Sequence, residues 1–184
     1  MWNVGGAFDT TTMGGGFLPR HALFAVGTGK EAANSRLRKC PVADEVFHNE
    51  PAADFSQAAN RQSMTVALTK VRASLKETYP LFINGRDVPE RPTATSINPA
   101  RPSEVVGHVC QATAADLDAA VAATQDAFST WRETRPGSRA AYLLRAASAL
   151  RKRIWEASAM LVLEVGKPWD QASHDVAEAI DFLE

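Results

Sequence analysis

Residues 113–131, TAADLDAAVAATQDAFSTW, decide the fold of the region around them. Thr113 followed three residues later by Asp116 is the pattern of a capping box, with Asp in place of the usual Glu or Gln. A stripe then recurs at steps of three and four residues, which is the period of an amphipathic helix. Its members are Leu117, Ala120, Val121, Thr124, Phe128 and Trp131. This stretch therefore predicts a helix with one apolar face.

More helix is expected on the C-terminal side. Pro136-Gly137 ends the first helix, and Ser138 is a candidate cap for a second helix that runs toward Gly166. Residues 151–153 are all basic and fall between the apolar positions, so we interpret them as a solvated face. A last helix is expected from about Asp170.

That last helix reaches the final residue, Glu184, without a stop signal. Each of its large apolar side chains contributes about 1.5–3 kcal/mol to folding when fully buried, and this requires another part of the protein to cover it. The expectation from the sequence is that the chain is truncated.

On the N-terminal side, an apolar stripe predicts a helix over residues 61–78, with Asn60 as its cap and Pro80 as its limit. The stripe comprises Met64, Leu68, Val71 and Leu75. Asn84-Gly85 follows a short apolar run at residues 81–83 and predicts a tight β-hairpin that closes at residues 86–88.

Two further strands are expected, a short one over residues 95–97 and a longer one over residues 104–111. From its own pattern the chain is thus mostly helical, with a short β-hairpin and one or two further strands.

The composition excludes several classes of protein. Among 184 residues, 20 Lys and Arg oppose 21 Asp and Glu, and 45% of residues are hydrophobic, which is ordinary for a globular protein. No basic excess suits nucleic acid or an anionic membrane surface, and no apolar run approaches the roughly 18 residues of a membrane span. Two cysteines without metal-ligand spacing, Cys40 and Cys110, indicate a reduced, cytoplasmic chain.

Residues 1–44 differ from the rest, because they are rich in Gly and Thr and show no sustained period. We expect them to be poorly ordered, and residues 45–184 to form the folded part. The first 43 residues carry a net charge of 5 − 2 = +3, so an organelle transit peptide, and with it a mitochondrial matrix location, is the alternative.

The residues alone show no complete active site. Cys110 lies within an expected strand and lacks an activating base nearby in sequence, so it is expected to be a core or edge cysteine. No Gly-rich turn fits a dinucleotide, and no His pair fits a metal ion. We therefore expect no catalytic, cofactor-binding or metal-binding residue in this chain.

Several segments nevertheless resemble, in order and spacing, the N-terminal third of an aldehyde dehydrogenase. The matching segments are Asn98-Pro99-Ala100, residues 102–107, the helix to Phe128 and Trp131, Arg139, residues 164–167 and residues 175–182. Within that superfamily they look most like the L-glutamate γ-semialdehyde (1-pyrroline-5-carboxylate) dehydrogenases. The features that point there are Phe47, residues 49–51, Asp54-Phe55, Val71-Arg72, residues 79–81 and Asn84-Gly85.

The resemblance implies an α/β aldehyde dehydrogenase fold whose Rossmann core is incomplete here. It also implies NAD-dependent oxidation of the semialdehyde to glutamate in proline catabolism, with the nucleophile and the NAD site outside this chain. One functional residue falls within the match: Glu178, which by resemblance binds the amino-bearing end of the substrate. Lys167 is a family landmark that we expect to complement a helix C-terminus.

The implied partners are a small aldehyde substrate and, in the full-length enzyme, further copies of the same chain. We expect this chain to be inactive alone. Two alternatives stay open: an aldehyde dehydrogenase with another substrate preference, and a non-catalytic helical module that binds a partner through its apolar faces.

Overall fold

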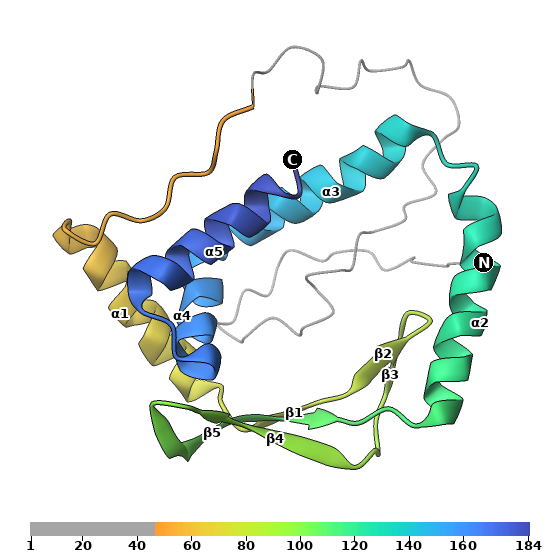
Figure 1. Cartoon of the computed structure of the whole chain (residues 1–184), viewed down its shortest axis with the longest axis horizontal. Coiled ribbons are helices and arrows are strands. Elements are labelled where there is room, and N and C mark those ends of the chain that lie inside the picture. The colour runs from red at the N-terminus through yellow and green to blue at the C-terminus, as the bar shows by residue number, and fades with distance from the viewer. Residues whose placement is uncertain (1–46) are drawn as a thin grey trace, which may run out of the picture.

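The computed structural model describes residues 47–184, and the predictions made for residues 1–44 and Cys40 lie outside the described residues. Along the described part, one helix is followed by five strands and then by four helices (Figure 1). They are α1 (Ala58–Ala73), β1 (Glu77–Tyr79), β2 (Leu81–Ile83), β3 (Arg86–Val88), β4 (Thr93–Asn98), β5 (Arg101–Cys110), α2 (Ala114–Trp131), α3 (Pro136–Arg151), α4 (Ile154–Val165) and α5 (Trp169–Asp181). The mixed α/β class is confirmed.

One apolar core joins α1 to α4. Met64 and Val71 of α1 and Ala159 of α4 are completely buried, and Leu163 is almost so. Three partly buried aromatic rings extend this core beyond α1: Phe55 lies 6.2 Å from Trp155 and 5.6 Å from Trp169, measured between ring centroids. The two helices are therefore fixed to each other and to the chain that precedes α1.

A second, smaller core joins α5 to α3. Ala147 of α3 and Ile180 of α5 are completely buried, and Val176 is 4% exposed. Figure 1 shows these two helices running side by side, with α4 beside α5. Helix α5 thus packs its apolar side on α3 and α4 and leaves its opposite side open.

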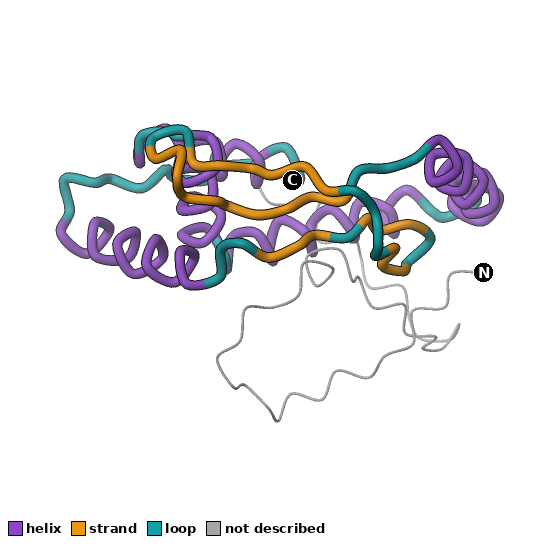
Figure 2. The backbone as a smooth tube through the Cα atoms, turned by 90° about the horizontal axis from the view of Figure 1, so that it is seen from below, coloured by secondary structure: helices purple, strands orange, loops and turns teal. Residues whose placement is uncertain are grey.

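The strands form two separate sheets below the helices (Figures 1 and 2). In the first, β5 lies between β1, which is parallel to it, and β4, which is antiparallel. The second is the predicted hairpin of β2 and β3. Its turn residues Asn84 and Gly85 have φ angles of 51° and 74°, the two positive values that the Asn-Gly pair supplies most readily.

Helix α2 stands apart from the other helices (Figures 1 and 2). The predicted capping box is present: the Thr113 side chain accepts from the backbone N–H of Asp116, and the Asp116 carboxylate accepts from that of Thr113. Arg91 donates two hydrogen bonds of 2.8 Å to the same carboxylate. Asp116 is the only buried residue of α2, whereas Leu117 is 62% exposed and Phe128 58% exposed.

The prediction of a helix over residues 61–78 was wrong at both ends. Helix α1 begins at Ala58 after the N-cap residue Gln57, and Asn60 instead donates from its side chain to the carbonyl of Asp54. The helix ends at Ala73, and Glu77–Tyr79 forms β1. The reason is nonlocal, because β1 exists only through its pairing with β5.

The prediction of a single helix from Ser138 to Gly166 was also wrong. Pro136 is the first residue of α3, the position where a missing N–H costs nothing, so Ser138 is not the cap. The chain leaves helical geometry at Arg153, where φ is −116° and ψ is 19°. The spacing of the apolar residues stays helical across this break, so the sequence pattern does not show where one helix ends and the next begins. Nor is the basic run simply solvated, since Arg151 and Arg153 each pair with carboxylates.

We predict that Gly166→Ala lowers the stability of the chain. Gly166 ends α4 with a φ of 75°, and a Cβ atom there would lie 2.8 Å from Cγ of Pro99. The left-handed conformation alone costs an L-residue about 1–2 kcal/mol. Urea unfolding followed by circular dichroism measures the loss. Gly137→Ala is the control, because Gly137 lies within α3 and lacks a positive φ; an equal loss in both variants would contradict the prediction.

We predict that Asp116→Asn destabilises the chain at neutral pH and that this difference shrinks in acid. The hydrogen bonds from Arg91 and Thr113 hold the pKa of Asp116 well below its usual value of 3.8. Because the folded pKa is depressed, the stabilisation is present above 3.8 and is lost as the pH falls below it. Thermal unfolding at several pH values tests this. Asp118→Asn is the control, since Asp118 is exposed on the same helix and is expected to leave the melting temperature unchanged.

Candidate functional site

The side of α5 that faces away from α3 and α4 carries Glu178, the residue that the sequence singled out. The chain before α1 lies along this helix. We call residues 49–55 the arm. Asn49 donates from its side chain to one carboxylate oxygen of Asp181 at 2.8 Å, and the backbone N–H of Glu50 donates to the other at 2.6 Å. The backbone N–H of Ala53 donates to the Ser173 hydroxyl at 2.9 Å. These bonds attach the arm to both ends of α5.

An ion network strengthens the attachment at the C-terminal end. Arg151 of α3 pairs with Glu50 of the arm at 2.6 Å and with Glu184 at 2.8 Å. The hydrogen bonds from Glu50 and Asn49 lower the pKa of Asp181 from its usual value, with a smaller contribution from the charge of Arg151. Asp181 is therefore held in its ionised form by the arm.

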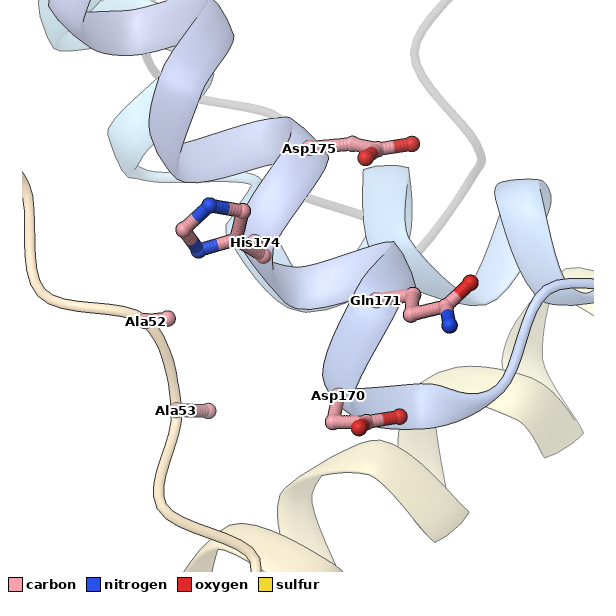
Figure 3. Close-up of a pocket in the computed structure, with 6 residues that line it drawn as sticks. All are labelled: Ala52, Ala53, Asp170, Gln171, His174 and Asp175. Carbon is pink, nitrogen blue, oxygen red and sulfur yellow. The ribbon is translucent and has the colours of Figure 1, made fainter.

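A small open hollow separates the arm from the N-terminal half of α5. It is lined by Ala52, Ala53, Asp170, Gln171, His174 and Asp175. Figure 3 shows the His174 ring turned toward the arm, whereas the side chains of Gln171 and Asp175 point away from it. The two alanines leave space where larger side chains would fill the hollow.

Glu178 follows on the next turn of α5 and is exposed. Its carboxylate makes no hydrogen bond or ion pair with any of the residues 47–184. The carboxylates three positions before and after it are both engaged: Asp175 pairs with Lys167, and Asp181 with the arm. Of the three, Glu178 is the one without a partner among residues 47–184.

Lys167 does not do what the sequence suggested. It comes directly after Gly166, the C-cap of α4, but its ammonium group is bonded to Asp175 on α5 and not to the last carbonyls of α4. The arm residues that hold Asp181 were noted in the sequence only as family landmarks. No sequence signal predicts these bonds, because their partners are 120 to 132 positions apart.

The cysteine within the described residues is buried. Cys110 is 5% exposed on β5 and forms no disulfide, so the expectation of a core cysteine is confirmed. Within residues 47–184 no group of His, Cys, Asp and Glu side chains is arranged to hold a metal ion. Over the same range, none of the helices is both long and apolar enough to span a membrane.

Comparison with known proteins identifies the family. The model of the aldehyde dehydrogenase family matches residues 87–184, which is more than half of the chain. The chain belongs to the aldehyde dehydrogenase family. Among curated relatives, the 1-pyrroline-5-carboxylate dehydrogenase of Bacillus pumilus is 49% identical over 138 residues, and that of Staphylococcus saprophyticus is 44% identical over 138 residues. In each case the match covers 75% of this chain and 27% of the relative.

Solved aldehyde dehydrogenase structures agree with these matches. The 1-pyrroline-5-carboxylate dehydrogenase from Thermus with bound NAD superposes with a TM-score of 0.75 at 44% identity, over 77% of this chain and 28% of that chain. The enzyme from Mycobacterium tuberculosis bound with NAD gives a TM-score of 0.68 at 31% identity, over 76% of this chain and 26% of that chain. This aldehyde dehydrogenase chain thus spans about a quarter of the length of its relatives.

We predict that Asp181→Ala releases the arm of this aldehyde dehydrogenase chain from α5. The backbone N–H of Glu50 loses its acceptor, so its hydrogen exchange should quicken roughly fivefold, the effect of losing one ordinary hydrogen bond. NMR-detected exchange measures this. In the wild type, lowering the pH well below 3.8 should reduce the protection of the Glu50 amide relative to its intrinsic exchange rate at that pH, because protonation of Asp181 weakens the bond.

Asp170→Ala is the matched control, since Asp170 is exposed on α5 and bonds to no arm residue. Unchanged exchange at Glu50 in Asp181→Ala would show that the arm is held by other contacts.

Proposed function

We propose that this chain supplies the arm and the outer helices of an NAD-dependent L-glutamate γ-semialdehyde dehydrogenase, which oxidises the semialdehyde to glutamate in proline catabolism. Relatives at 42–49% identity that carry the name 1-pyrroline-5-carboxylate dehydrogenase support this substrate. Under this proposal the chain is inactive alone, and the full-length enzyme is a homo-oligomer whose small-molecule partner is the aldehyde.

The observation that carries the substrate class is the free carboxylate of Glu178. An ammonium group gains a charge-assisted hydrogen bond from an exposed carboxylate that has no internal partner. The amino group of glutamate semialdehyde is such a cation, and a fixed bond to it orients the rest of the substrate chain. Orientation of this kind is worth a large part of an enzyme's rate, because a small misplacement of reacting atoms is costly.

The described residues do not fit NAD. Hydride transfer on a dinucleotide fold needs a Gly-rich turn between a strand and a helix, and β5 leads into α2 through Gln111, Ala112 and Thr113 without a glycine. The contribution of the described residues is to bind and orient one end of the substrate.

The test uses a fusion of the full 184-residue chain to the part of the Bacillus pumilus enzyme that follows the matched segment. We expect NAD-dependent oxidation of glutamate semialdehyde. Glu178→Gln in the fusion should lower kcat/KM for this substrate about 10- to 100-fold, the value of a hydrogen bond to a charged group. It should leave unchanged the oxidation of 5-oxopentanoate, the same semialdehyde without the amino group.

Asp170→Asn is the matched control, because it removes one exposed carboxylate from α5 without touching Glu178. Size-exclusion chromatography and thermal unfolding confirm that each variant is folded. An equal loss with both aldehydes would reject the role of Glu178, and activity confined to amino-free aldehydes would favour an aldehyde dehydrogenase with another substrate preference.

A further inference from the structure

Three carboxylates follow one another at intervals of three residues along α5: Asp175, Glu178 and Asp181. Residues at this spacing are neighbours on a helix surface. Each carboxylate lies about 4.5 Å from the next along the helix axis, so an ammonium group bound at Glu178 has one carboxylate a turn before it and one a turn after it. The ammonium group binds only one of these carboxylates if the other two are already paired with groups of the protein.

Two different parts of the chain occupy them. Lys167, in the connection between α4 and α5, pairs with Asp175, and its side chain and that of Asp175 are equally exposed, at 34%. At the other end, Asn49 and the N–H of Glu50 bind both oxygens of Asp181. Glu178 lies between the two pairs without a partner among the described residues.

The turn at Gly166 places Lys167 for this contact. Its φ of 75° reverses the chain after α4, so that the next residue faces the start of α5. The Lys167–Asp175 bond therefore joins the α4–α5 connection to the middle of α5.

We propose that Lys167 is a positioning residue, which acts by occupying Asp175 and so leaves Glu178 as the single acceptor for the substrate's ammonium group. This inference rests on the proposed function. Without Lys167, Asp175 becomes a second acceptor one turn away, and a substrate bound there has its aldehyde displaced by several ångströms. Such binding is nonproductive, so the turnover number falls although affinity for the substrate does not.

The test compares three variants of the fusion protein: Lys167→Gln, Asp175→Asn, and both together. For glutamate semialdehyde we expect Lys167→Gln to lower kcat roughly tenfold without raising KM, and the double variant to restore kcat, because the competing carboxylate is gone. Asp175→Asn alone should match the wild type. Oxidation of 5-oxopentanoate should be equal in all four proteins.

A purely structural Lys167–Asp175 bond gives a different pattern. Both single variants and the double variant would then lose activity with both aldehydes, which would overturn the proposal. The two proposals also fail separately: if Glu178→Gln leaves the preference for the amino-bearing aldehyde intact, the substrate role of Glu178 is wrong, whereas failed restoration in the double variant rejects only the role of Lys167.

A second measurement needs no catalysis. In the 184-residue chain, NMR titration with L-norvaline, which has the amino-acid end of the substrate and no aldehyde, should shift the amides around Glu178. In Lys167→Gln the amides in the helical turn of Asp175 should shift as well. In the double variant only the amides around Glu178 should shift. Shifts confined to Glu178 in Lys167→Gln would contradict the proposal.

Discussion

The packing of α4 against α1 on one side and α5 on the other is the contact on which the rest of the structure depends. Small side chains allow it: Ala159 and Ser158 are completely buried on α4, so neighbouring helices approach closely. Leu163 and Met64 then fill the space between α4 and α1. Because α5 is fixed through α4, the direction of its open side, and with it the position of Glu178, is set by a core that contains no functional residue.

Two elements predicted correctly from the sequence, the β2–β3 turn and the start of α2, are specified locally. The Asn84-Gly85 turn needs two adjacent residues, and the start of α2 needs only Thr113 and Asp116. Two features were missed because the local pattern does not show them. Strand β1 forms on β5, about 30 residues later, and the break at Arg153 interrupts a helix without interrupting its apolar period.

The candidate site shows the same division. Resemblance to a family identified Glu178, but periodicity places it only on a polar helix face, like Asp175 and Asp181. What distinguishes Glu178 is that both neighbours are already paired, one through the α4–α5 connection and one through the arm. This difference is a property of the tertiary structure, and no local sequence pattern encodes it.

Helix α2 buries little of its own surface within the described residues. Its apolar stripe is exposed in the described structure, and its N-terminus is held by Arg91 and the capping box around Asp116. The exposed stripe lies in a chain that spans about a quarter of its relatives' length.

The long separation of the arm from α5 has a consequence for the order of events during synthesis. The bonds from Asn49 and Ala53 join residues 132 and 120 positions apart. At about 5–20 residues per second, the ribosome needs about 6–26 s to make the intervening chain. Until Trp155 and Trp169 are synthesised, Phe55 lacks the two rings that it contacts in the folded chain. The nascent arm therefore carries an exposed aromatic ring. A chaperone that recognises unburied aromatic side chains can bind this segment until Trp155 and Trp169 have emerged and covered Phe55.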